Sequence, residues 1–177
     1  MLLTIGHSNR TAEEFTEMLS AHEVKLLIDV RAFPKSRYNP HFNSGALAEI
    51  LTAAGIEYRH MPELGGMRKA KRDSTNTAWR NDTFRGYADY MQKPEFEAAL
   101  SGLMQRAMES RAAIMCAEAN PRNCHRSLIA DALTARGFEV EHILSVTVRE
   151  PHKMTGFAKM EGSRVTYPGE NLELFGG

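Results

Sequence analysis

Both cysteines of this 177-residue chain lie in one short stretch, residues 114–133, which reads IMCAEANPRNCHRSLIADAL. Two arginines, a glutamate and a histidine stand with them between positions 116 and 126. A thiolate is a nucleophile, and a neighbouring imidazole or carboxylate can carry its proton. The stretch therefore predicts a site built around Cys116 or Cys124, with Glu118 and His125 as proton carriers.

A helix is expected to begin inside this stretch. Asn123 is a preferred N-cap residue, and the apolar residues from Leu128 onward recur at helical spacing. This places Cys124, His125 and Arg126 in the first helical turn. Free backbone N–H groups at a helix start attract anions and lower the pKa of a thiol. We expect a thiolate or a bound anion at this point.

The elements that position these residues follow from the apolar pattern. Short apolar segments at 2–5, 26–30, 56–61, 112–116 and 138–144 alternate with helix-period segments, one of which opens with a Thr11–Glu14 capping box. The alternation predicts a single-domain, three-layer Rossmann-like α/β fold with a mainly parallel sheet of about five strands. Residues 1–149 form the expected α/β domain. Residues 150–177 are a tail, either packed along the surface or forming a hairpin with a turn at Pro168-Gly169.

Ligands of open parallel sheets bind beyond the carboxyl ends of the strands, so the residues that follow each strand are site candidates. The long polar interval 63–86 is expected to be a loop over that edge. The candidate catalytic residues are Cys124, Cys116, Glu118, His125, Asp29 and His7. The candidate ligand-binding residues are Ser8, Asn9, Arg10, Arg31, Arg37, Gly65, Gly66, Arg68 and Arg126.

The charge balance and the hydropathy of the chain argue against a nonspecific nucleic-acid-binding protein and against a membrane-spanning one. Lysine plus arginine and aspartate plus glutamate both number 22, so the chain has no overall basic field for nonspecific nucleic-acid binding. The start, MLLTIGHSNR, does not have the form of a signal peptide, and no apolar run reaches the roughly 18 residues of a membrane span. We expect a cytoplasmic protein with reduced thiols and no membrane partner.

Five segments together resemble a known family. TIGHSNRT, IDVRAFPKSRYNPHF, LGGMR, FRGYADYM and CAEANPRNCHRSLIA, in this order, are similar to the domain-of-unknown-function 488 family of small bacterial and archaeal proteins. The resemblance covers about residues 1–145. It implies the same α/β fold and marks the following positions as the site: residues 7–10, Asp29, Arg31, Pro34, Ser36, Arg37, Cys116, Glu118, Cys124, His125 and Arg126. It implies no particular reaction.

Three functional hypotheses follow. The first is a thiol-dependent transferase or hydrolase without a cofactor, acting on an anionic, phosphate-bearing ligand such as a nucleotide or a nucleic-acid base. The second is a non-catalytic nucleotide or nucleic-acid binding module with structural or redox cysteines. The third is a metal-binding protein that holds zinc or iron with the Cys/His/Glu cluster, although the spacing of Cys116 and Cys124 is not that of the usual structural zinc sites.

Overall fold

Five parallel strands form the centre of the molecule, as predicted. The computed structural model describes residues 1–170 and places the strands of its main sheet in the order β3-β2-β4-β1-β5-β6. The five parallel strands are β1 (Leu2–Gly6), β2 (Leu26–Asp29), β3 (Glu57–His60), β4 (Ala112–Cys116) and β5 (Val140–Ile143). Because β1 and β4 are central neighbours, residues that follow them meet at one edge of the sheet.

A sixth strand lies at the edge of the sheet beyond β5. Strand β6 (Arg149–Pro151) pairs antiparallel with β5, opposing Glu150 to His142. It is three residues long and largely exposed, so the sequence contains no apolar alternation that would predict it. The sheet therefore contains one strand more than the five expected from the apolar segments.

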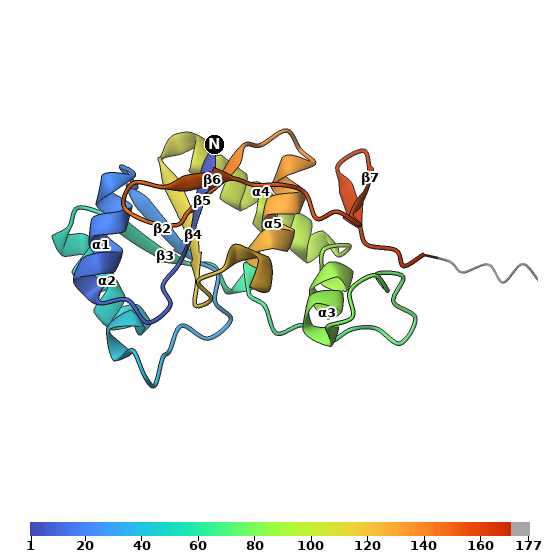
Figure 1. The fold of residues 1–177 in the computed structure, drawn as a ribbon, viewed down its shortest axis with the longest axis horizontal. Helices are drawn as coiled ribbons and strands as arrows, with labels where there is room; N and C mark the ends of the chain where they lie inside the picture. Colours follow the sequence, from blue (N-terminus) through green and yellow to red (C-terminus); the bar gives the residue numbers. More distant parts are fainter. Residues whose placement is uncertain (171–177) are drawn as a thin grey trace, which may run out of the picture.

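Helices cover both faces of the sheet, which confirms the three-layer prediction (Figure 1). Helices α1 (Ala12–Ala21) and α2 (Ser44–Ala53) pack on one face, where Leu3 and Ile5 of β1 join the core. Helices α4 (Pro94–Glu109) and α5 (Arg126–Thr134) pack on the opposite face with Leu2. Successive residues of β1 point to opposite faces, so Thr4 faces the α5 side.

The predicted capping box at the start of α1 is present, with Thr11 and Glu14 each accepting the other's backbone N–H. The interval 63–86 differs from the expected loop because helix α3 (Asp82–Tyr90) begins inside it. Burial in α3 runs through consecutive residues, 86–90, and so leaves no helical period in the sequence. Gly86 is required there, since a Cβ atom would lie 2.1 Å from the carbonyl oxygen of Arg68.

The tail returns to the α5 side of the sheet. A hairpin is present, but it is formed by β7 (Lys159–Glu161) and β8 (Arg164–Thr166) and turns at Gly162 (φ 62°) rather than at Pro168-Gly169. The second half of the expected hairpin, residues 171–174, lies outside the described residues. Tyr167 is fully buried beside α5. Over residues 1–170, none of the helices has the length and apolar character needed to cross a bilayer.

Candidate functional site

The site lies where β4 ends and the chain passes over the end of β1. Cys116 is the last residue of β4, and the segment 117–123 leads from it to Cys124. This segment packs so closely on β1 that a Cβ atom on Gly6 would lie 1.9 Å from the carbonyl oxygen of Glu118. A glycine at the end of β1 thus allows the segment to fold back and bring Cys124 to Cys116.

Helix α5 begins two residues later than predicted. Asn123 is not its N-cap but the last residue of a 3₁₀ turn (Pro121–Asn123), and Cys124 follows in extended conformation. His125 is the N-cap, and Arg126 is the first helical residue. The prediction was wrong because Pro121 and the side chain of Asn120, which accepts from the Arg122 N–H, form a separate turn first. The sulfur of Cys124 nevertheless lies 3.5 Å from the Arg126 backbone nitrogen, which donates to it.

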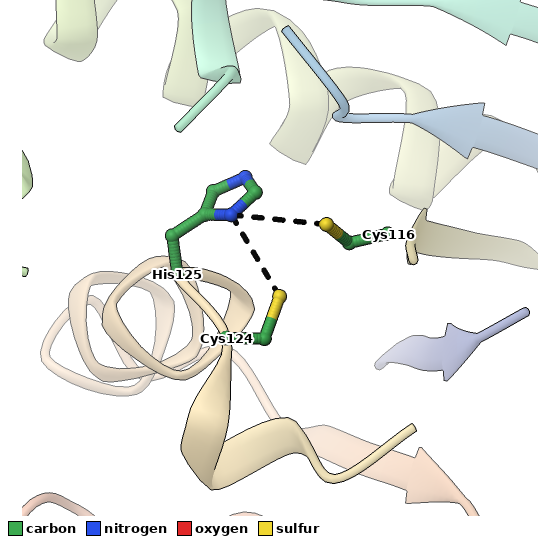
Figure 2. Close-up of side chains that lie close together, drawn as sticks. All are labelled: Cys116, Cys124 and His125. Atoms are coloured by element: carbon green, nitrogen blue, oxygen red, sulfur yellow. Dashed lines mark hydrogen bonds between the residues drawn. The ribbon is translucent and has the colours of Figure 1, made fainter. Parts of the chain in front are cut away.

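Figure 2 shows that both sulfurs face the same nitrogen of His125. The Nδ1 atom lies 3.7 Å from Cys124 Sγ and 3.9 Å from Cys116 Sγ. The Nε2 atom lies 3.0 Å from the carbonyl oxygen of Val30 and donates its proton to it. This second contact orients the ring and leaves Nδ1 to exchange a proton with the thiols.

Beneath the cysteines lies the guanidinium group of Arg126, of which only 1% is exposed. Its Nε donates to Cys124 Sγ at 3.4 Å, and its two terminal nitrogens donate to Thr4 Oγ1 and to the carbonyl oxygen of Glu118. Among residues 1–170, no carboxylate forms an ion pair with Arg126. A buried cation needs a compensating anion, and within the described part of the chain the ionisable acid that it contacts is Cys124.

The two thiols have opposite acidities. The hydrogen bond from Cys116 holds the pKa of Cys124 well below its ordinary value, against the effect of burial, and His125 and Arg126 lower it further. The same hydrogen bond, followed by burial, raises the pKa of Cys116. These opposite shifts favour a thiolate on Cys124 and keep the proton on Cys116.

Among the described residues, Cys116, Cys124 and His125 are also the candidate metal ligands. Their two sulfurs and His125 Nδ1 lie within 4.8 Å of one another. Glu118, the fourth residue of the predicted metal set, is not part of this group, and a structural zinc site uses four ligands. The guanidinium of Arg126 also brings a positive charge against Cys124, which opposes a second cation.

A cavity of about 420 Å³ opens above the cysteines. Cys116, Cys124 and His125 line it, and most of its lining surface is apolar. Of the residues predicted from the sequence, it brings together His7, Arg31, Gly66, Cys116, Glu118, Cys124 and His125. Glu118 is exposed at the edge of this cavity, which we call the thiol pocket.

Two predicted residues, Asp29 and His7, contact Arg31, which lines the pocket. Asp29 is fully buried and accepts from Arg31 through both carboxylate oxygens, the closest contact being 2.6 Å, and from Tyr58 Oη at 2.7 Å. It does not line the pocket. His7 donates from Nδ1 to the Ser8 carbonyl oxygen, and burial lowers its pKa to about 4. Asp29 positions Arg31 through this ion pair, and His7 Nε2 lies 3.4 Å from Arg31 Nη1.

The remaining predicted residues lie apart from the thiol pocket. Arg10 lines a separate cavity of about 860 Å³ on the other side of segment 117–123, and Arg68 stacks on the Tyr90 ring at 3.7 Å. Arg126 lies beneath the cysteines, as described. None of the following lines the pocket: Ser8, Asn9, Arg37 and Gly65. The arginines predicted to hold one anion are thus distributed over several sites.

Residues that the sequence did not single out supply the pocket walls. Phe33, Met67, Phe84 and Tyr87 all line it, and Phe33 and Met67 are more than 70% exposed. They occur in polar segments without apolar period, so burial patterns do not reveal them. The sequence feature that could identify such residues is an isolated aromatic or apolar side chain inside a polar loop.

The comparison with known proteins supports one family. The model of the family described as "Domain of unknown function DUF488" matches residues 11–133, more than half of the chain. No curated protein and no solved structure matches the chain. The matched range contains β4, both cysteines, His125 and most of α5. The chain therefore belongs to the DUF488 family.

Proposed function

We propose that the protein is a thiol-dependent transferase or hydrolase whose nucleophile is Cys124. One observation carries the proposal: the buried guanidinium of Arg126 contacts the Cys124 sulfur and has no carboxylate partner among the described residues. A thiolate balances that charge, and a thiolate is the nucleophilic form of cysteine.

In the proposed reaction, Cys124 Sγ attacks an electrophilic atom of the ligand and forms a covalent bond to it. The leaving group departs with the bonding electron pair and takes from His125 Nδ1 the proton that Cys124 gave up when its thiolate formed; in the second step His125 or Glu118 accepts the proton of the incoming nucleophile. Water or an acceptor then displaces Cys124 and completes hydrolysis or transfer. Cys116 donates to the resting thiolate and keeps it in place.

The proposed ligand is a nucleotide or a nucleic-acid base. The apolar walls of the thiol pocket fit a planar ring, and exposed Phe33 and Met67 at its mouth can stack on one. Lys35 lines the same pocket and supplies positive charge for a phosphate group.

The test is alkylation of the reduced protein with iodoacetamide over a range of pH, with each cysteine followed separately by peptide mass. We expect Cys124 to react faster than Cys116 and to stay reactive at about pH 6, below the ordinary thiol range. The proposal is wrong if Cys124 reacts only at alkaline pH. A native mass spectrum of the same sample is the control for the metal hypothesis, because one bound zinc or iron ion per chain would overturn the assignment. Nucleotides and short oligonucleotides are then screened for turnover that Cys124→Ser abolishes.

A further inference from the structure

A buried chain of hydrogen bonds leads away from Cys124 through the sheet to the C-terminal tail. It starts at Arg126, whose Nη1 donates to Thr4 Oγ1 at 3.3 Å in the middle of β1. Thr4 is fully buried and stands beside His142 of β5 in the parallel register. Its Oγ1 lies 2.7 Å from His142 Nδ1. A threonine in the core of a central strand thus connects the arginine to a histidine on the next strand.

The chain continues from β5 to α5. The Nε2 atom of His142 lies 3.0 Å from His152 Nδ1, and His152 Nε2 lies 2.8 Å from Asp131 Oδ1. Asp131 has no exposed surface and also accepts from the Thr155 N–H at 3.0 Å and from Tyr167 Oη at 2.8 Å. Three donors from the tail therefore hold the carboxylate in one position.

One assignment of protons satisfies every member of this chain. Thr4 accepts from Arg126, so its own hydroxyl proton is free to be donated to His142 Nδ1. His142 then donates from Nε2 to His152, and His152 donates from Nε2 to Asp131. Burial, followed by the positive charges of neighbouring residues, lowers the pKa of His142 to about 4, so this ring is neutral. Each link fixes the orientation of the next.

We propose that this chain, which we call the Thr4–Asp131 relay, holds the Arg126 guanidinium in place against the Cys124 sulfur. Its links are Thr4, His142, His152 and Asp131, and they are positioning residues because none of them lines the thiol pocket. The inference rests on the proposed function, since it concerns the same nucleophile. The relay extends beyond the residues that the family model matches, because Thr4, His142 and His152 lie outside residues 11–133.

The geometry at Arg126 explains how a remote residue can act on the thiol. Arg126 has three fixed contacts, to Cys124, to Thr4 and to the Glu118 carbonyl oxygen. A planar guanidinium held at three points cannot rotate without losing one of them. Loss of the Thr4 contact leaves the group free to turn away from the sulfur, and the pKa of Cys124 then rises.

The experiment compares the pH profile of Cys124 alkylation in the wild type, Thr4→Val, Thr4→Ser and Asp131→Asn. Valine keeps the shape of Thr4 without its hydroxyl, and serine restores the hydroxyl. We expect Thr4→Val to move the midpoint of the pH profile upward by about one unit, which slows the reaction roughly tenfold at pH values below that midpoint, and Thr4→Ser to restore it. Thr52→Val is the matched control, because the Thr52 hydroxyl donates to Ala48 on the exposed surface of α2.

Asp131→Asn separates positioning from direct electrostatics. Removal of a negative charge would by itself lower the pKa of Cys124 and speed alkylation at low pH. Loosening of the relay has the opposite sign, and we expect slower alkylation. Tyr167→Phe removes one donor to Asp131 and replaces Asp131→Asn in the comparison if that variant does not fold.

The outcomes distinguish this inference from the proposed function. A wild-type profile in the ordinary thiol range overturns both. A low-pH wild-type profile that is unchanged in folded Thr4→Val, or faster in Asp131→Asn, overturns the relay and leaves the proposed function standing. Thermal melting of each variant verifies the fold, and a purely structural role predicts a lower melting temperature with an unchanged pH profile.

Discussion

The Nε atom of Arg126 lies 3.4 Å from the sulfur of Cys124, and both side chains are buried. The arginine is the first residue of α5, so its backbone N–H and its guanidinium both donate to the same sulfur. Cys124 thereby combines two features that favour a thiolate, a helix N-terminus and a cationic neighbour. Cys116 has neither contact, although its sulfur is equally close to His125.

Replacement of Arg126 by methionine should raise the pKa of Cys124. The variant removes the charge that compensates the thiolate, and the pKa of Cys124 rises because a buried anion without a partner is unfavourable. We expect alkylation of Cys124 at about pH 6 to slow by more than tenfold. Arg122→Met is the control, since Arg122 is exposed in the preceding turn and has no contact with either sulfur. Equal rates in the two variants would refute the role of Arg126.

The cysteine pair should give the free energy of unfolding a maximum with pH. Because the pKa of Cys124 is lowered on folding, its contribution is complete above the unfolded thiol pKa of about 8.5 and is lost as pH falls toward the folded value. The raised pKa of Cys116 has the reverse effect and removes stability above about pH 8.5. Urea unfolding of the reduced wild type minus that of Cys124→Ser should therefore peak near that pH. A difference that is independent of pH would contradict both shifts.

Asp29→Asn should destabilise the fold by about 3 kcal/mol, because it leaves the buried Arg31 guanidinium without its counter-ion. The matched control is Glu57→Gln, which breaks an ion pair to Arg59 in which both side chains are more than half exposed. That change should cost at most about 1 kcal/mol. Denaturant unfolding measures both, and similar costs for the two variants would argue against a buried role for Asp29.

Gly6→Ala should displace segment 117–123 and with it the cysteines. The added methyl group would overlap the Glu118 carbonyl oxygen, and we expect a loss of about 1–3 kcal/mol. Gly102→Ala in α4 is the control, because no atom lies within 4 Å of the added Cβ and alanine is the better helix former. Chemical unfolding should rank the control at or above wild type. The alkylation ratio of Cys124 to Cys116 should fall only in Gly6→Ala.

The regular part of the fold was predictable because its signals are local. Apolar segments gave the five parallel strands, and Thr11 with Glu14 gave the start of α1. Helix α3 was not, because its five consecutive buried residues include Asp89, whose carboxylate accepts from the Lys71 backbone N–H, Ser74 and Asn76. Such a helix is stabilised by contacts with a distant loop, which the spacing of its own apolar residues does not reveal.

The candidate site was predictable as a place on the sheet but not as a set of contacts. Strand ends share one edge, which brings Cys116 and His7 to the same pocket. The edge is divided by segment 117–123, so Arg10 faces a different cavity from Arg31. Nothing in the spacing of residues reveals this division. The spacing also does not reveal that Thr4, which the sequence pattern places in an apolar strand, contacts Arg126.

The position of the tail has a consequence for the order in which the site matures. Asp131 receives its donors from His152, Thr155 and Tyr167, all of which follow it in the chain. During synthesis, both cysteines are added to the chain before these residues. On the relay inferred above, a chain without this tail has a less reactive Cys124. The nucleophile reaches its full reactivity only after the tail has packed against α5, which protects the unfinished fold from its own chemistry.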